Sequence, residues 1–577
     1  MNKFYTSVEK WGNDILYVYY EGDQRLVERI EYCPTLFVPT GLIPKKDGAY
    51  KTLNGVSVDS IQPGFMKDCK EFIEKTSSHN YKIYGNTDYV SAFISDEYPN
   101  GCTPDISVMN ILYLDIEVAS NDGFPHPEDA KSEVTAITVK HSTDDVFYTW
   151  GCGAYDAEDN VRYMKCSNER DLLQRFITHW AQDTPDVITG WNVEGFDIPY
   201  LFNRIKMLFG SKELKRFSLF GNASCEKTKF GNDWKVKIQG TSCLDYLALF
   251  RKFGYSYGQP ENFKLDTIGQ LVVGENKLDY SEYSSLQDLY LNDHQKFIEY
   301  NIKDVHLVER IEEKAGLIQL ALTLAHKANS TYGSTFGSVR IWECFVYNVL
   351  KRMNVVIPQK TFSDDDRSIE GGYVKEPIKG AHKWVASFDA NSLYPHLIMQ
   401  YNLSPETVRT MFGGHSVDDL LNGKELNIPK DCNITPGGLT TTNTRKGLFP
   451  QIIDGLYNER VLIKNEMLKV QQKMESNKTL ELERMNDRLN NEQMAIKILM
   501  NSLYGAMANK HFLYFNANMA EAITFSGQLT IRWAERAVNN YLQKIMGDNK
   551  DRVIAIDTDS LYITCLLYTS PSPRDRS

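Results

Sequence analysis

The chain has 577 residues, 42% of them hydrophobic and 24% charged, and a formal net charge of −11 at pH 7. This length exceeds what one hydrophobic core supports, and it predicts three or four domains. No apolar run reaches the roughly 18 residues of a membrane span, so we expect no membrane partner. The acidic balance alone disfavours a nucleic-acid partner, although net charge averages over faces and metal-binding carboxylates add to it. Ten cysteines without C-x-x-C spacing indicate neither a zinc site nor a disulfide framework, and they favour a reducing, cytoplasmic location.

The first half of the chain predicts a β-rich domain followed by an α/β domain. Residues 1–105 alternate short strands with turns, and residues 106–315 interleave strand and helix patterns. Within the second stretch we expect a long hairpin, with arms at 226–230 and 234–238. A mixed segment, 316–370, follows, and we expect it to connect back to the N-terminal domain.

The second half predicts a strand, a helical hairpin and an unusual end. Residues 383–388 form an apolar strand that leads into Asp389. Residues 447–510 have a mostly helical pattern that breaks at Ser476-Asn477-Lys478-Thr479, which indicates an antiparallel helical hairpin. From residue 565 to 577 the composition turns to Ser, Pro and Arg. We expect this stretch to be a non-native tail on a truncated chain; a genuine disordered C-terminus is the alternative.

Two pairs of carboxylates, far apart in the chain, suggest two metal centres. Asp115 and Glu117 form one pair, Asp557 and Asp559 form the other, and each pair follows an apolar, strand-like run. Side chains at i and i+2 of a strand point to the same face. Two acids there repel each other and resist desolvation, and a divalent cation held by carboxylate oxygens is the simplest remedy.

Two further elements carry acids that a metal could share with Asp115. Asp197 directly precedes a helix predicted at 198–208, and an ordinary N-cap, with Pro199 just inside the helix, is the alternative. Tyr300 and Asp304 stand at i and i+4 and therefore lie on one face of a helix. A surface helix is the alternative for this pair.

Taken in order, these residues resemble the three exonuclease motifs of the DnaQ-like 3'–5' proofreading nucleases. The motifs are D-x-E on a strand, N-x3-F-D before a helix and Y-x3-D on a helix. The resemblance implies an RNase-H-like exonuclease domain at 106–315, in which two divalent ions are bound by four acids: Asp115, Glu117, Asp197 and Asp304. It also implies that Tyr300 orients the attacking water.

Three motifs of the second half resemble those of family B DNA polymerases, in particular the replicative polymerases of T-even-type bacteriophages. The first, Asp389-Ala390-Asn391-Ser392-Leu393-Tyr394-Pro395, reads D-x2-S-L-Y-P; residues 497–505 read K-x3-N-S-x-Y-G, and residues 557–560 read D-T-D-S. Residues 370–374, Glu-Gly-Gly-Tyr-Val, are a weak form of the Y-x-G-G/A segment of that family. Taken alone, an acid at a strand end is usually structural, with Ser392 capping the helix that follows.

Cationic and polar residues on the helical hairpin suit a triphosphate. Lys497, Asn501 and Tyr504 follow the i, i+4, i+7 rule and line one helical stripe. Arg460 and Lys464 are like charges at i and i+4, a pairing that costs a few tenths of a kcal/mol unless an anion bridges them. A solvated basic face is the alternative.

The resemblance assigns a role to each of these residues and implies two Mg²⁺ ions, or Mn²⁺, in each active site. The roles are Asp389 and Asp559 as metal ligands together with the Ala390 carbonyl, Asp557 in support, Arg460, Lys464, Lys497 and Asn501 on the triphosphate, Leu393 and Tyr394 at the sugar, and Tyr504 near the nascent base pair. Tyr394 is expected to exclude a 2'-hydroxyl.

We therefore expect a multidomain α/β protein, a template-directed DNA polymerase with a proofreading exonuclease. The resemblance implies a palm with an antiparallel sheet at 371–446 and 511–564, helical fingers at 447–510 and a missing thumb. Expected partners are primer–template DNA, deoxynucleoside triphosphates and, in the full-length protein, a sliding clamp and a single-strand-binding protein, in the host cytoplasm if a phage encodes the protein. As a fragment, the chain should degrade single-stranded DNA but not extend a primer. The alternatives are an exonuclease-only DNA-processing enzyme and a non-catalytic RNA-binding repressor.

Overall fold

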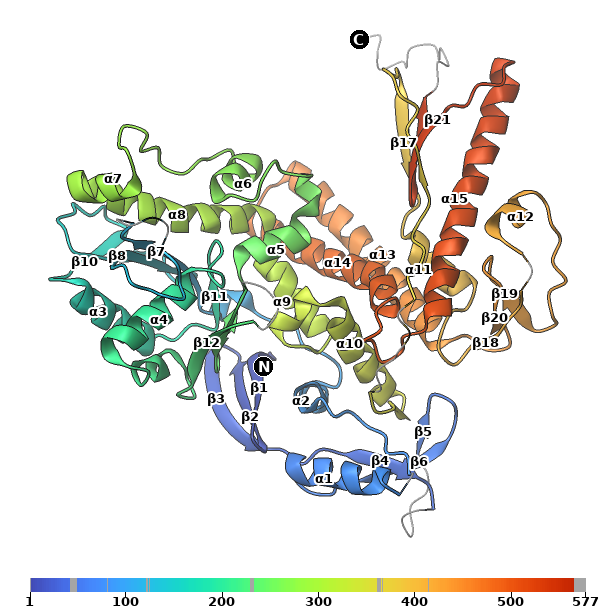
Figure 1. The fold of residues 1–577 in the computed structure, drawn as a ribbon, viewed down its shortest axis with the longest axis horizontal. Helices are drawn as coiled ribbons and strands as arrows, with labels where there is room; N and C mark the ends of the chain where they lie inside the picture. The colour runs from blue at the N-terminus through green and yellow to red at the C-terminus, as the bar shows by residue number, and fades with distance from the viewer. Residues whose placement is uncertain are drawn as a thin grey trace. The chain divides into compact units, whose positions relative to one another are not determined.

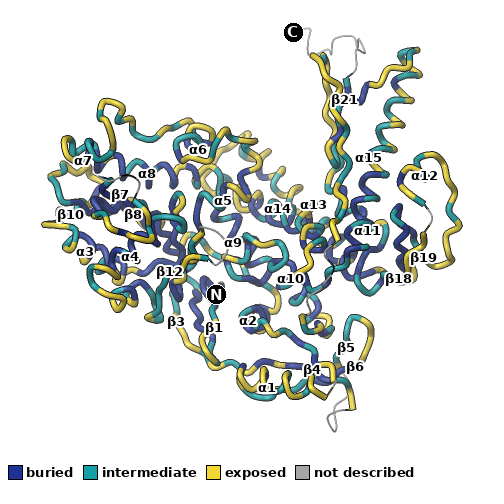
Figure 2. The backbone as a smooth tube through the Cα atoms, in the orientation of Figure 1, coloured by how far each residue is buried: buried dark blue, intermediate teal, exposed yellow. Residues whose placement is uncertain are grey.

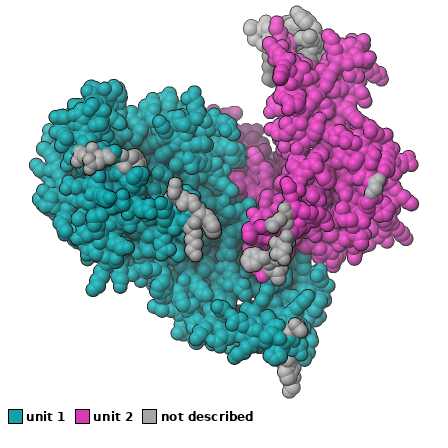
Figure 3. Space-filling model, in the orientation of Figure 1, with its two compact units in different colours: residues 1–359 teal, residues 360–577 magenta. Residues whose placement is uncertain are grey.

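The computed structural model divides into two compact units, residues 1–359 and 360–577 (Figure 3). It describes residues 2–41, 49–79, 81–120, 123, 125–228, 233–360, 365, 367–413 and 415–564. No helix in these ranges combines the length and the apolar character that crossing a membrane requires. The tail that we expected at 565–577 lies outside the described residues, so its nature and the truncation of the chain stay predictions.

The N-terminal part contains two small sheets. The first is antiparallel, in the order β1 (Lys3–Trp11), β2 (Asp14–Glu21), β3 (Gln24–Glu31). The second has the order β15 (Val355–Val356), β5 (Tyr50–Thr52), β6 (Ser57–Ile61), β4 (Leu36–Pro39). Because β15 pairs in parallel with β5, the chain returns to this sheet after some 300 residues, as expected for the connecting segment.

The expectation of strands and turns alone at 1–105 was wrong, because two helices lie there. They are α1 (Met66–Ser77) and α2 (Tyr89–Glu97). The first is a short amphipathic helix whose start is fixed by the Asp68 carboxylate, which accepts the Phe65 N–H at 2.8 Å. A helix of this length gives only a weak periodic signal, and the surrounding strands concealed it.

A six-stranded mixed sheet forms the centre of the first unit (Figure 1). Its order is β10 (Val161–Lys165), β9 (Phe147–Gly151), β8 (Val134–His141), β7 (Ile111–Val118), β11 (Val187–Thr189), β14 (Ser242–Cys243). β7, β8 and β9 are antiparallel, and the remaining neighbours are parallel. Every residue of β8 is buried, which requires cover on both faces (Figure 2).

Helices supply that cover. α3 (Glu169–Gln182) and α4 (Asp197–Phe209) pack with the sheet in one hydrophobic cluster, whereas Phe297 and Ile298 of α8 (His294–Ala315) belong to another, around Ala136 of β8. The remaining helices of this unit are α5 (Tyr246–Phe253), α6 (Leu265–Val272), α7 (Leu286–Asn292), α9 (Leu317–Lys327) and α10 (Ser338–Arg352). The predicted hairpin is confirmed as an antiparallel pair, β12 (Ala223–Lys227) and β13 (Trp234–Ile238). Its first arm begins three residues before the predicted 226–230, and residues 229–232, which include the end of that predicted arm, lie outside the described residues.

The second unit is built on a four-stranded antiparallel sheet. Its order is β16 (Val374–Lys375), β21 (Val553–Asp557), β22 (Ser560–Thr564), β17 (Val385–Asp389). The long helix α15 (Ala517–Met546) packs on it, with Ile531 and Leu542 in one cluster with residues of β21 and β22. β17, at the edge, is exposed throughout.

A helical hairpin and a second small sheet complete this unit (Figure 1). The hairpin consists of α13 (Leu448–Ser476) and α14 (Leu480–Met507), so the predicted break at Ser476–Thr479 is confirmed. α11 (Leu393–Gln400) follows β17. The small sheet has the order β18 (Val408–Met411), β20 (Leu439–Thr442), β19 (Cys432–Ile434), and α12 (Val417–Leu421) lies in the chain between β18 and β19.

Candidate active sites

Three acids converge in the first unit. Asp115 and Glu117 alternate with buried residues on β7, as predicted, and α8 contributes Asp304. One carboxylate oxygen of each residue lies within 4.8 Å of those of the other two. Tyr300 lies one helical turn before Asp304 on α8 and is likewise buried, which confirms the shared helical face and contradicts the surface-helix alternative.

Burial and mutual repulsion disfavour the charged forms of these acids. Burial raises the pKa of Asp115 to about 8, and the negative charge of Asp304 adds to the effect. Burial raises the pKa of Asp304 to about 6, and it raises that of Glu117 well above its ordinary value. A cluster of this kind holds protons at neutral pH unless a cation takes their place.

Lys277, which no sequence pattern singles out, faces this cluster. Lys277 Nζ lies 2.6 Å from Asp304 Oδ2 and 4.8 Å from the centroid of the Tyr300 ring. Burial nevertheless raises the pKa of Asp304, because desolvation outweighs the attraction of the ammonium group. The other oxygen, Asp304 Oδ1, is buried and has no hydrogen-bond partner among the described residues. An orphaned carboxylate oxygen beside two more acids is suited to a metal ion.

Asn301 fixes the orientation of Asp115. Its amide group donates to Asp115 Oδ2 at 2.7 Å, and its carbonyl oxygen accepts from the Thr138 hydroxyl at 2.5 Å. Thr138 stands directly opposite Asp115 on β8. Helical periodicity does not single out Asn301, because its role depends on the neighbouring strand.

Asp197 lies beside the cluster and does not cap its own helix. α4 begins at Asp197, and Phe196 occupies the N-cap position. The carboxylate instead accepts the N–H of Ile116 on β7 at 3.0 Å, so the capping interpretation was wrong. Burial, followed by the charge of Asp115, raises the pKa of Asp197 well above its ordinary value. It is not one of the three acids within 4.8 Å of each other.

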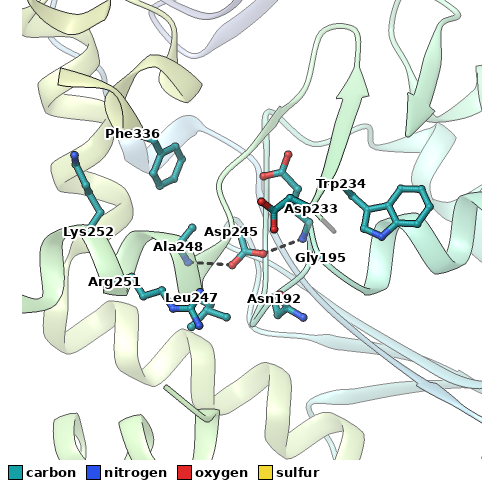
Figure 4. Close-up of a pocket in the computed structure, with 11 residues that line it drawn as sticks. Asn192, Gly195, Asp233, Trp234, Asp245, Leu247, Ala248, Arg251, Lys252 and Phe336 are labelled. Carbon is teal, nitrogen blue, oxygen red and sulfur yellow. Dashed lines mark hydrogen bonds between the residues drawn. The ribbon is translucent and has the colours of Figure 1, made fainter. Parts of the chain in front are cut away.

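The loop before Asp197 approaches β7 so closely that it needs glycine. A Cβ atom on Gly190 would lie 2.3 Å from the Leu114 carbonyl oxygen. Asp245 also holds this loop, because its carboxylate accepts the Glu194 N–H at 2.9 Å, while it caps α5 by accepting the Ala248 N–H at 3.2 Å (Figure 4). These backbone contacts therefore fix the position of Asp197.

A pocket of about 630 Å³ opens beside this loop (Figure 4). Its lining includes the aromatic side chains of Trp234 and Phe336, two cations and three acids: Arg251, Lys252, Glu194, Asp233 and Asp245. Stacking surfaces combined with cations are typical of sites that hold single-stranded nucleic acid.

The second group of acids lies around a tight turn between β21 and β22. Asp389, at the end of β17, pairs with Ser560, and the Ala390 N–H donates to the Asp559 carbonyl at 2.8 Å. β21 ends at Asp557, and Asp559 belongs to the turn, where Thr558 has a φ of 52°. The expectation that Asp557 and Asp559 share one strand face was therefore wrong.

Burial and neighbouring charges also disfavour the charged form of an acid in this second group, but less strongly than in the first cluster. Burial, with the charges of Asp389 and then Asp557, raises the pKa of Asp559. Among the described residues these aspartates do not form a set within 4.8 Å of each other, unlike the first cluster.

The ring of Tyr394 is held firmly next to these aspartates. Tyr504 of α14 contacts it edge to face, with the ring centroids 4.8 Å apart. A Cβ on Gly372 would lie 3.0 Å from the Tyr394 hydroxyl oxygen, and one on Gly527 would lie 2.9 Å from Cε1. Two glycines and a tyrosine thus surround the ring and leave it little room to move.

The weak motif at 370–374 forms hydrogen bonds both to α15 and to the turn between β21 and β22. The Gln528 amide donates to Glu370 Oε1 at 2.9 Å and to the Gly371 carbonyl at 2.8 Å. The N–H of Thr558 donates to the Tyr373 carbonyl at 2.9 Å. The segment therefore links α15 to the turn that carries Asp559, a role that its sequence did not disclose.

The predicted triphosphate residues occupy the helical hairpin with different exposures. Arg460 is buried, and its Nε donates to Gln493 of α14 at 3.3 Å. Lys464 and Asn501 are exposed, and Lys497 is half-buried. Leu393, expected to bind the substrate, is buried. Ser392 precedes α11, but its side chain makes no capping hydrogen bond, so the capping alternative is not supported.

Comparison with known proteins identifies the chain. The family described as DNA polymerase family B matches residues 322–572, and its exonuclease domain matches residues 61–268. The DNA-directed DNA polymerase of Enterobacteria phage T4 is 32% identical, over 98% of this chain and 70% of the phage protein. The chain belongs to DNA polymerase family B. It is a DNA-directed DNA polymerase with an exonuclease domain, and its substrates are DNA and nucleotides.

Other relatives agree with this assignment. The corresponding enzyme of Escherichia phage RB69 is 31% identical, over 98% of this chain and 70% of its own length. DNA polymerase 1 of Pyrococcus abyssi is 25% identical, over 79% of this chain and 54% of its own length. The predicted family and the predicted polymerase activity are confirmed, and the polymerase family's match at 322–572 speaks against the exonuclease-only alternative. Polymerases and exonucleases of this family use divalent metal ions, which the acidic cluster on β7 and α8 fits.

Proposed function

We propose that the first acidic cluster is a Mg²⁺-dependent 3'–5' exonuclease site that removes misincorporated nucleotides from a primer end. One observation carries the proposal: three carboxylates, Asp304 buried and Asp115 and Glu117 little exposed, lie within 4.8 Å of each other, and one oxygen of Asp304 has no protein partner among the described residues. The ligands would be Asp115, Glu117, Asp197 and Asp304. Bound Mg²⁺ would neutralise the scissile phosphate and activate a water molecule.

The other residues of the site would position the attacking water molecule and the metal-binding carboxylates. Burial raises the pKa of Tyr300 well above neutrality, so its hydroxyl stays protonated and can hold a water molecule by donating to it or accepting from it. Lys277 would keep Asp304 anionic, and Asn301 would hold Asp115 in one orientation. The pocket beside the loop, with Trp234 and Phe336, would receive an unpaired stretch of the strand, and we therefore expect single-stranded DNA to be the better substrate.

Replacement of the strand acids tests this proposal. Asp115→Ala with Glu117→Ala should abolish Mg²⁺-dependent degradation of single-stranded DNA, because the site loses both ligands of β7. The matched control is Asp156→Ala with Glu158→Ala, two exposed acids with the same D-x-E spacing in the same unit. Survival of more than a few per cent of the activity in the first variant would contradict the proposal.

We further propose that the second group is the nucleotidyl-transfer site. Asp389 and Asp559 would hold two Mg²⁺ ions with the Ala390 carbonyl, and Asp557 would support them. The hydrogen bond between Ala390 and Asp559 favours this set, because it holds two of its three members together. In this proposal residues 371–446 and 511–564 are the palm, and residues 447–510 are the fingers.

The fingers would bring cations to the triphosphate. Arg460, Lys464, Lys497 and Asn501 would clamp it, since phosphoryl transfer depends mainly on positioning and charge neutralisation. The contact between Tyr504 and Tyr394 supports this arrangement, because it connects the α14 stripe to the aspartates. A sliding clamp, a single-strand-binding protein and the host cytoplasm remain expectations that rest on the resemblance.

Tyr394 would be the sugar selector, with the backbone of Leu393 beside it. A ring confined by two glycines and Tyr504 cannot yield to an added hydroxyl. Tyr394→Ala should therefore raise the affinity for ATP relative to dATP in the presence of primer–template and Mg²⁺. Tyr541→Ala, an exposed tyrosine on α15, is the control. Unchanged sugar discrimination would mean that Tyr394 only fills space.

A further inference from the structure

A second pocket, of about 640 Å³, lies in the N-terminal part of the first unit, outside the residues assigned to either reaction. It is formed where the end of β1 and the β1–β2 turn face α1 and the start of α2. The lining residues are Lys10, Gly12, Asn13, Met66, Lys67, Lys70, Ile73, Glu74, Thr87 and Tyr89.

The rim of this pocket is cationic. Lys10 comes from β1, and Lys67 and Lys70 stand at i and i+3 on α1, so their side chains are neighbours. Among the described lining residues Glu74 is the single acid. It lies 3.9 Å from Lys70, and Glu71 lies 4.0 Å from Lys67. Contacts of this length between exposed side chains contribute roughly 0–1 kcal/mol, so the lysines are easily drawn to a stronger anion.

The floor of the pocket is apolar. Met66 and Tyr89 are buried, and the Lys10 ammonium lies 5.1 Å from the centroid of the Tyr89 ring. The Asn13 side chain accepts the Lys67 N–H at 3.1 Å and so fixes α1 against the β1–β2 turn. The pocket is therefore formed before any ligand arrives, which lowers the entropic cost of binding.

We propose that this pocket binds a nucleotide unit, with the phosphate held by Lys10, Lys67 and Lys70 and the organic part placed over Met66, Ile73 and Tyr89. Three ammonium groups match a multiply charged phosphate, and lysine binds phosphate as a point charge without demanding one geometry. The volume lies within the range of about 300–1,000 Å³ for small-molecule sites and exceeds what inorganic phosphate alone would fill. Nucleotides are the phosphate esters that a polymerase handles, either free or within a single strand.

Calorimetric titration of the whole chain with dAMP at low salt and in EDTA tests the proposal. EDTA removes metal-dependent binding at the two acidic centres. The variant Lys10→Gln, Lys67→Gln, Lys70→Gln should bind at least tenfold more weakly than the wild type. The control Lys51→Gln, Lys75→Gln, Lys82→Gln, three exposed lysines of the same region, should bind within twofold of it. Inorganic phosphate should bind more weakly than dAMP, because it does not use the apolar floor.

A parallel titration with the oligonucleotide (dT)8 identifies the source of the nucleotide. Lysine-dependent binding of dAMP assigns the pocket to a free nucleotide, and lysine-dependent binding of (dT)8 alone assigns it to a strand. Equal affinities of the two triple variants for both probes, or no saturable binding of either, would overturn the proposal. The first triple variant should keep the exonuclease activity and the unfolding temperature of the wild type. Nucleotide binding at this pocket and the exonuclease activity are measured separately, so a negative binding result would leave the proposed reactions untouched.

Discussion

Replacing Gly190 by alanine should disable the proposed exonuclease site without changing any of its acids. The new Cβ would lie 2.3 Å from the Leu114 carbonyl oxygen, whereas ordinary Cβ contacts begin at 3.4 Å. Loop and strand must therefore separate by about 1 Å, a strain that typically costs about 1–3 kcal/mol in a packed interior. The 3.0 Å hydrogen bond between Asp197 and the Ile116 N–H crosses the same boundary, so Asp197 moves away from β7.

An error of about 1 Å in a catalytic group can cost about 10²-fold in rate, and we expect a loss of that order. The assay is Mg²⁺-dependent degradation of a 5'-labelled single strand, with the unfolding temperature measured in parallel. Gly333→Ala is the control, because a Cβ there has no neighbour within 4 Å and the residue does not have a positive φ. If Gly190→Ala retained activity within threefold of the wild type, the inferred dependence of Asp197 on this close approach would be refuted.

Three further predictions concern the charges of the same site. In EDTA, folded-state pKa values of about 8 for Asp115 and about 6 for Asp304 lie above the value of about 4 for an unfolded carboxyl group. The stabilisation that is fully present below about pH 4 is therefore lost as pH rises from about 4 to about 6 for Asp304 and to about 8 for Asp115. Asp115→Asn should therefore lessen the fall in unfolding temperature over this interval, and an unchanged fall would contradict the inferred burial. Lys277→Gln removes the cation beside Asp304 and should lower exonuclease activity roughly tenfold or more at pH 7. Part of this loss should be recovered at higher pH, where Asp304 is anionic without the lysine. A pH–rate profile parallel to that of the wild type would speak against this role. Asn301→Ala frees Asp115 to rotate and should lower the rate about tenfold with little change in substrate KM, whereas a change in KM alone would assign Asn301 to binding.

The parts of the acidic cluster on β7 and α8 that follow a regular period were predictable from sequence. Asp115 and Glu117 stand two residues apart in an apolar strand, and Tyr300 and Asp304 stand four apart in a helix, so local geometry alone places each pair on one face. Lys277 could not be found in this way, because it lies between α6 and α7 and reaches Asp304 only through the tertiary fold.

The predictions that were wrong relied on a local sequence rule at positions where the tertiary structure places the residue differently. An aspartate before a helix usually caps it, but Asp197 finds the Ile116 N–H on a neighbouring strand. Alternation along a strand placed Asp559 beside Asp557, but the chain turns at Thr558. The helical hairpin at 448–507 was predicted well, because its break is polar and its two arms are long.

The parallel pairing of β15 with β5 has a consequence for synthesis on the ribosome. At about 5–20 residues per second, β15 emerges roughly 15–60 s after β5. During that interval the β5 edge has unpaired backbone groups, while the central six-stranded sheet, all of whose strands precede β15, can already form. The oldest part of the nascent chain is therefore among the last parts of the first unit to be completed, and chaperones that shield strand edges would act on it before β15 emerges.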